Sequence, residues 1–167
     1  MKNPPYIIAL ALCVITVKSL FAFTDPRSEG PVNRGSELII SEIMYHPQAP
    51  APDSSFQVES AYEFLELWNP SDEVVDLTGA SFERGLRFVM PQFQLEPGQR
   101  AVIVHTQAAF EERYGAEVTV IGAYGTGEGS KLSNNGERLM LTSIYGETVA
   151  DFRYNDGGGW PEGADGR

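Results

Sequence analysis

Cysteine, histidine and basic side chains are all scarce in this chain. Its 167 residues include one cysteine, Cys13, and two histidines, His46 and His105. A single thiol forms no internal disulfide, and these counts leave no set of Cys or His ligands for a zinc site. Counting alone leaves a Ser/His/Asp arrangement open, but no Gly-x-Ser-x-Gly elbow presents a nucleophile. The sequence therefore predicts no catalytic residues, no cofactor and no metal site.

The shortage of positive charge bears on possible partners. The chain has 12 Lys+Arg against 23 Asp+Glu, a formal net charge of -11. Phosphate recognition depends on Lys and Arg, so this charge argues against nucleic acid as a partner. Acidity is typical of a soluble secreted protein, and it leaves open a protein that meets divalent cations.

The long apolar run is confined to the N-terminus. Lys2 precedes an apolar stretch from Tyr6 to Val17, and a small residue, Ala22, follows shortly after. The stretch is too short to span a bilayer comfortably. The pattern predicts a signal peptide over residues 1–22 and a secreted or cell-surface location, extracellular or periplasmic, with no membrane insertion after cleavage. Cleavage would also remove Cys13, and an exported chain without cysteine is typical of bacteria.

A linker and then a run of short strands make up the rest of the chain. Residues 23–36 are rich in Pro, Gly, Ser and charge and predict a flexible linker, and 48–60 predict a poorly ordered loop. Between them and afterwards, short β-like runs alternate with turn signals. The expected strands lie within 37–47, 62–72, 73–79, 80–91, 100–106, 117–122, 137–143 and 148–155. This spacing predicts an all-β protein, an antiparallel β-sandwich.

The segment 62–72 predicts a central strand. Glu63, Leu65 and Leu67 fall on one face, while Phe64, Glu66 and Trp68 fall on the other together with Tyr62, so both faces carry large apolar groups. One helix is expected over 106–115, capped by Thr106 and stopped by Gly115. Turns are expected at Arg84-Gly85, Pro97-Gly98 and Asn135-Gly136, the last as a hairpin, and "IYGE" predicts a second hairpin.

The glycine-rich stretch "GAYGTGEGSKLS", residues 122–133, invites comparison with a phosphate-binding loop. In that loop Gly and Lys are adjacent, Ser or Thr follows, and a helix begins there. Here Ser130 separates Gly129 from Lys131, Leu132 follows, and the chain leads into a strand. The stretch therefore predicts a flexible loop of the sandwich.

Carboxylates offer two further hypotheses. Glu42 and Glu66 could meet across neighbouring strands, as a pair suited to acid/base work or as acceptors of structural hydrogen bonds, and the second interpretation is favoured. Asp151, Asp156 and Asp165 lie near glycine-rich turns and bring oxygen ligands suited to calcium, although their spacing matches no EF-hand. Trp160 is either a sugar-stacking platform or, as favoured, a cap on the core.

Five stretches, taken in order, resemble the lamin tail domain in its bacterial secreted form. They are "LIISEIMYHP", "YEFLELWNPSDEVVDLTGASF", "LEPGQRAVIV", "LSNNGERLMLTSIYGETVADFRYND" and "WPEGADGR", which together cover about residues 37–167. The resemblance implies an immunoglobulin-like β-sandwich domain over 37–167 and no catalysis. Family members usually continue with a last strand, so the resemblance also implies that this strand is lacking and that a sheet edge is open to a second copy.

Three functions follow as hypotheses. The first is a secreted, non-catalytic module with a binding, scaffolding or surface-positioning role, whose partner is an unknown protein or a surface glycan. The second is the N-terminal part of a larger exported enzyme, such as a spore-coat-type kinase, a nuclease or a phosphoesterase. The third is a calcium- or glycan-binding sandwich.

Overall fold

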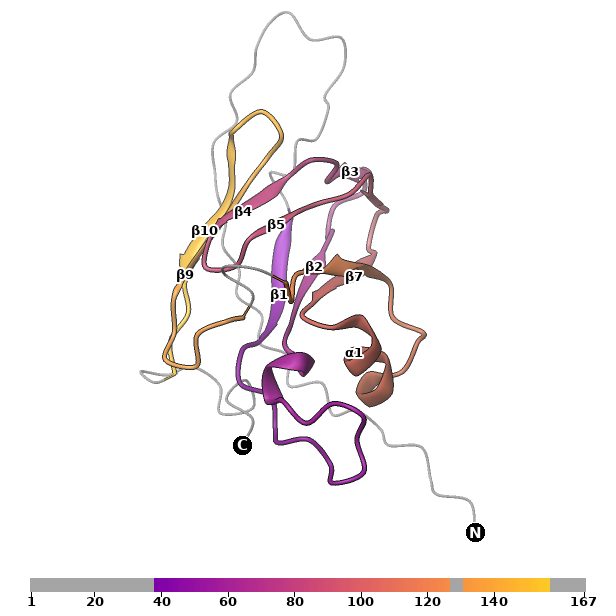
Figure 1. Cartoon of the computed structure of the whole chain (residues 1–167). Coiled ribbons are helices and arrows are strands. Elements are labelled where there is room, and N and C mark those ends of the chain that lie inside the picture. The colour runs from indigo at the N-terminus through magenta and orange to yellow at the C-terminus, as the bar shows by residue number, and fades with distance from the viewer. Residues whose placement is uncertain (1–37, 127–130, 157–167) are drawn as a thin grey trace, which may run out of the picture.

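Two four-stranded sheets stacked face to face form the body of the molecule. The computed structural model describes residues 38–126 and 131–156, and Figure 1 shows its strands and short helices. The first sheet has the order β1-β2-β7-β8 and the second the order β10-β9-β4-β5, while β3 and β6 form a separate two-stranded ribbon. The strands are β1 (Ile39–Met44), β2 (Phe64–Trp68), β3 (Val75–Asp76), β4 (Ser81–Arg84), β5 (Phe88–Val89), β6 (Gln94–Leu95), β7 (Arg100–Val104), β8 (Val120–Ala123), β9 (Arg138–Thr142) and β10 (Thr148–Arg153).

The main core lies between the two sheets because side chains along a regular strand point alternately inward and outward. From β2, Leu65 and Leu67 are fully buried, and from β9, Leu139 and Leu141 are fully buried. The prediction of a central strand at 62–72 is confirmed, since β2 pairs with β1 on one side and with β7 on the other. The predicted all-β immunoglobulin-like sandwich with one short α-helix is confirmed as well.

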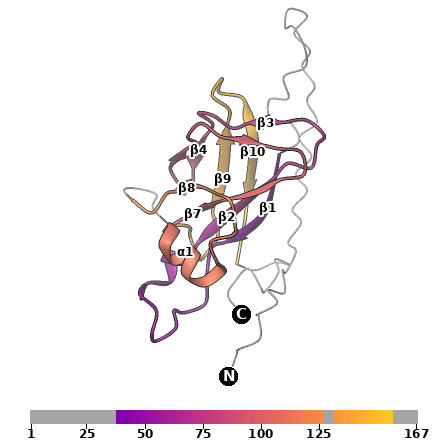
Figure 2. The ribbon, with the colours of Figure 1, turned by 90° about the vertical axis from the view of Figure 1, so that its right-hand side faces the viewer.

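The α-helix α1 (Gln107–Tyr114) covers part of the outer side of the first sheet, as the two views in Figures 1 and 2 show. Phe110 and Tyr114 lie on one helix face, as the sequence predicts, and both rings pack edge-on against Phe64 with centroid distances of 5.3 Å. Gly115 ends the helix with a φ of 90°. Thr106 stands at the N-cap, but its side chain makes no capping hydrogen bond.

One strand pair departs from the antiparallel pattern. β7 and β8 run parallel, and α1 lies between them in the sequence. Parallel neighbours need a crossover connection, which is usually a helix. The single predicted helix is therefore what brings β8 to the edge of the first sheet in the parallel direction.

The turns at Arg84-Gly85 and Pro97-Gly98 form where predicted, and each glycine has a positive φ. The 143–147 turn joins β9 to β10 as the expected hairpin. The prediction of a hairpin at Asn135-Gly136 is wrong, because β8 and β9, which flank this turn, lie in different sheets. Asn135 keeps a negative φ, while Gly136 alone has a positive value, 83°.

The segment 48–60 is better ordered than its Pro/Ser composition predicts. Ser54 Oγ contacts the hydroxyl of Tyr62, which ends the short 3₁₀ helix η1 (Glu59–Tyr62), and donates to the Glu112 carboxylate on α1. Arg113 stacks over the Tyr62 ring and donates to the Gln48 carbonyl at 3.0 Å. These contacts hold the segment against α1.

Residues 1–22, 23–36 and 157–167 lie outside the described residues. The predicted signal peptide, the linker and the lack of a last strand therefore stay predictions. Within the described residues, no helix is long and apolar enough to cross a membrane.

Candidate functional site

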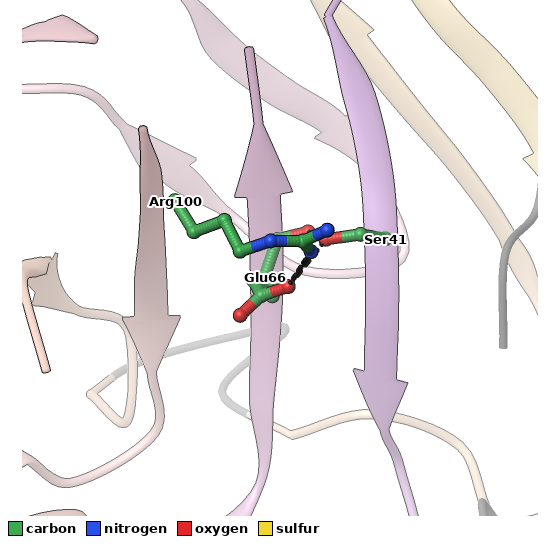
Figure 3. A network of polar contacts seen from close by, with 3 residues as sticks. All are labelled: Ser41, Glu66 and Arg100. Carbon is green, nitrogen blue, oxygen red and sulfur yellow. Dashed lines mark hydrogen bonds and ion pairs between the residues drawn. The ribbon is translucent and has the colours of Figure 1, made fainter. Parts of the chain in front are cut away.

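A polar network crosses the outer side of the first sheet, beyond the part that α1 covers. Figure 3 shows Ser41 from β1, Glu66 from β2 and Arg100 from β7 pointing toward one another across three neighbouring strands. The Arg100 Nη1 lies 2.5 Å from Glu66 Oε1, and Ser41 Oγ donates to the same oxygen at 2.6 Å. The Arg100 guanidinium also stacks over the Trp68 ring, 4.5 Å from its centroid.

A β-bulge in β1 builds this network. The pairing of β1 with β2 shifts between Ile40 and Glu42, so that Ser41 is an extra residue in the ladder. A bulge turns one more side chain toward the same face. It explains why Ile40 and Ile43, three residues apart, both point into the core, and why Ser41 reaches Glu66 on the outer side.

Glu42 and Glu66 are direct partners in the β1–β2 ladder, so the predicted meeting of the two carboxylates is confirmed. Burial, together with the negative charge of Glu66, raises the pKa of Glu42 to about 7, while the charge of Arg100 opposes the shift. Glu66 is held by Arg100 and Ser41. The favoured interpretation, in which each carboxylate accepts structural hydrogen bonds, thus holds for Glu66, which accepts them on a central strand, and stays a prediction for Glu42.

Glu63, just before β2, lies on the inner side and is 2% exposed. Its Oε2 accepts the Leu132 N–H at 2.7 Å and the Tyr124 O–H at 3.2 Å. Burial raises the pKa of Glu63 to about 7, while these two hydrogen bonds and the charge of Lys131 counteract the shift. Glu63 and Glu66 lie on opposite faces, as predicted, and they serve separate networks.

The contacts of Glu63 also bear on the glycine-rich stretch. A phosphate loop needs backbone N–H groups that point at the ligand. Here the Leu132 N–H is taken by the Glu63 carboxylate, and the Leu132 side chain is buried in the core. No helix follows in the described part of the chain, since the next element is β9. Gly129 and Ser130 lie outside the described residues.

The two histidines lie on separate segments, at the end of β1 and at the end of β7. His105 Nδ1 lies 2.8 Å from Thr106 Oγ1, and its ring packs edge-on against Tyr124 at 5.6 Å. Burial lowers the pKa of His105. His105 therefore packs as a structural residue, and His46 is partly buried.

The proposed calcium ligands are only partly described. Both carboxylate oxygens of Asp151 are taken by Arg138, at 2.6 Å to Nε and 2.5 Å to Nη2. Asp156 is exposed, and Asp165 and Trp160 lie outside the described residues. In 38–126 and 131–156, no group of three or more His, Cys, Asp or Glu residues could hold a metal ion.

The comparison with protein families agrees with the fold. The family model described as Lamin Tail Domain matches residues 31–156. The chain belongs to the lamin tail domain family. A search of curated proteins found no match. Lamin tail domains are non-catalytic immunoglobulin-like modules, and the networks of this lamin tail domain around Glu63 and Glu66 hold strands and loops together.

Sequence reasoning missed two features of this lamin tail domain. The first is Arg100, whose role depends on the β2–β7 pairing that places it beside Trp68 and within reach of Glu66. The "ELW" pattern places Glu66 and Trp68 on one face. This pattern is the signal that a cation from the next strand could pair with the carboxylate and stack on the ring. The second is Ser54, whose contact with Glu112 spans 58 residues, and no local pattern predicts such a contact.

Proposed function

We propose that this chain is an exported, non-catalytic module that binds a partner outside the cell and so positions the protein there. The observation that carries the proposal is the state of Glu66, one of the two carboxylates considered for acid/base work: it accepts hydrogen bonds from Arg100 and Ser41. A carboxylate held in this way by an arginine is a structural group. Family membership supports the same interpretation.

The shape of the module leaves a surface for a partner. Both described helices, α1 and η1, pack together on the side of the first sheet (Figure 2). No described helix covers the outer face of the β10-β9-β4-β5 sheet. Binding modules use such broad sheet faces, or the loops at the ends of the sandwich, as contact surfaces.

Export is tested by the mass of the natural product recovered from outside the producing cells. The proposal expects a chain that begins near residue 23, because the signal peptide pattern ends at Ala22. Recovery only from the cell interior, with residues 1–22 retained, would contradict it.

Partner binding is tested with the exported protein, fluorescently labelled and titrated onto washed cells of the same organism. The expected result is saturable binding that excess unlabelled protein displaces. A second experiment measures hydrolase and transferase activity of the same protein on general substrates. The Glu66→Gln variant is measured beside it as the control. Absence of saturable binding, or an activity that this variant abolishes without unfolding, would overturn the proposal.

A further inference from the structure

The outer face of the second sheet carries three arginines. In β9 and β10 the side chains of Leu139 and Ala150 are buried between the sheets, so Arg138 and Arg153, at the alternate positions, point to the opposite, outer face. In β4 Phe82 is buried, and the bulge between Phe82 and Arg84 adds one residue, which turns Arg84 to the outer face as well. All three arginines are exposed.

The register brings the arginines together. Arg138 and Arg153 are direct partners in the β9–β10 ladder, and Arg84 is the partner of Met140, two residues from Arg138. Side chains at such direct and diagonal positions lie within about 5 to 8 Å of one another. We name the three residues Arg84, Arg138 and Arg153 the arginine face.

Two carboxylates accompany the arginine face. Asp151 forms a two-pronged ion pair with Arg138. The hydrogen bond from Arg138 lowers the pKa of Asp151, and the charges of Arg138 and Arg84 lower it further. Glu83, at the bulge of β4, accepts a hydrogen bond from Ser81 at 2.6 Å. Among the described residues, three guanidinium groups thus face two carboxylates, whereas in the whole chain 23 acidic residues outnumber 12 basic ones.

One direct cross-strand pair of the arginine face consists of two like charges. Like charges directly opposite each other across a ladder destabilise a sheet, and Arg138 opposes Arg153. A chain rich in Asp and Glu could place one of them at residue 153 and gain a cross-strand ion pair instead. Positions that break a local rule in this way are expected at functional surfaces.

We propose that the arginine face binds an acidic polysaccharide, whose sugar carboxylates pair with the guanidinium groups of Arg84, Arg138 and Arg153. The proposal rests on the proposed function, because an exported module meets such polymers at the cell surface. Guanidinium groups bind carboxylates through paired N–H donors. Neighbouring strands lie about 4.8 Å apart, which is the scale of one sugar ring, so a linear polymer that crosses the strands can contact them in turn.

The competing partners fit this surface less well. An extended peptide gains most binding affinity by adding to the edge of a sheet, where its main chain forms hydrogen bonds. A nucleic acid has a denser line of charge, which the net charge of -11 repels. At about 0.1 M salt the screening length is about 10 Å, so the nearby guanidinium groups act most strongly on either polymer, and the acidic remainder of the chain repels the polymer of lower charge density less.

The test is titration calorimetry of the full chain with polygalacturonate in about 0.1 M salt. Methyl-esterified polygalacturonate is the uncharged control polymer, and poly-glutamate is the acidic peptide control. Arg153→Gln removes one guanidinium and leaves the Arg138–Asp151 ion pair in place. Lys131→Gln, at an exposed position in the loop before β9, is the charge-matched control variant.

Polygalacturonate is expected to bind and its methyl ester is not. Arg153→Gln should weaken binding about threefold, the size of one exposed ion pair, and Lys131→Gln should leave it unchanged. The triple variant Arg84→Gln, Arg138→Gln and Arg153→Gln should weaken it more than tenfold, with an unfolding midpoint as the check on folding.

Equal binding by wild type and Arg153→Gln, equal binding of both polymers, or binding of poly-glutamate alone would overturn the proposal. Its failure is distinguishable from failure of the proposed function. If the exported protein still binds cells saturably, only the acidic polysaccharide is refuted as the ligand. If it binds neither, both proposals fail.

Discussion

Replacing Glu63 with glutamine should change how stability depends on pH. Glu63 is 2% exposed, and burial raises its pKa from 4.5 to about 7. In the unfolded chain the carboxyl loses its proton near its ordinary pKa of 4.5, while in the folded protein it keeps the proton until about pH 7. Between these values the unfolded state binds fewer protons, so the free energy of unfolding falls as the pH rises, and it levels off above about pH 7.

The magnitude follows from the two pKa values. One pKa unit corresponds to about 1.4 kcal/mol, so ionising Glu63 should cost the wild type about 3 kcal/mol between pH 4.5 and 8. Glutamine has no charge to lose and can still accept the Leu132 N–H. Its amide group adds a fixed cost of about 1–3 kcal/mol if it lacks an acceptor in the core. This cost is the same at every pH and leaves the slope unaffected. Glu42, whose pKa is also about 7, titrates in both proteins and cancels.

The assay is urea unfolding of both proteins, followed by fluorescence, at half-unit steps from pH 4.5 to 8. The stability of Glu63→Gln relative to wild type should increase by about 3 kcal/mol over this range. Glu117→Gln, at an exposed site, is the control, and its curve should stay parallel to that of wild type. Parallel curves for Glu63→Gln as well would contradict the raised pKa of Glu63, because they would mean that Glu63 titrates alike in the folded and unfolded chains.

Three further predictions concern stability, each measured by urea unfolding. A double-mutant cycle of Glu66→Gln and Arg100→Gln should give a coupling energy of about 1 kcal/mol, the upper range for a partly exposed ion pair, and a value near zero would show that the network does not hold the strands. Leu65→Ala should cost about 3 kcal/mol, since the side chain is fully buried, and a loss below about 1 kcal/mol would place Leu65 outside the core. Gly136→Ala should cost more than Gly98→Ala: both glycines have positive φ, but only at Gly136 would a Cβ meet neighbouring backbone, so equal losses would contradict the packing of this turn.

The sequence predicts the features that depend on local pattern. The alternation of side chains in 62–72 places Leu65 inside and Glu66 outside, and the structure agrees because β2 is a regular strand with neighbours on both sides. The helix at 107–114 and the turn at Pro97-Gly98 form as expected. Each of these elements is determined by side-chain periodicity or by glycine conformation within a few residues.

Local sequence pattern does not predict the features that depend on which strands become neighbours. The alternation in β1 is interrupted at Ser41, and an interrupted pattern does not reveal that the extra residue forms a bulge that reaches Glu66. Asn135-Gly136 has the composition of a hairpin turn, but the next strand joins the other sheet. The contact of Ser54 with Glu112 likewise depends on where α1 packs.

Glu63 and Glu66 show how one segment can give two side chains of the same type different roles. They are three residues apart, so a period of two places them on opposite faces. On the inner face none of the described arginines contacts Glu63, and its carboxylate accepts N–H and O–H groups from Leu132 and Tyr124. Burial raises the pKa of Glu63 to about 7, which makes its charge sensitive to pH near neutrality. On the outer face Arg100 compensates the charge of Glu66. If this account is right, acidification from pH 8 to 5 should raise the free energy of opening the loop before β9, because opening exposes Glu63 to water, where its carboxyl binds a proton less readily than when buried. Hydrogen exchange of the Leu132 amide would detect this change after correction for the intrinsic rate, with the Val102 amide of β7 as the reference. Equal changes in protection at the two amides would contradict the separation of the two networks.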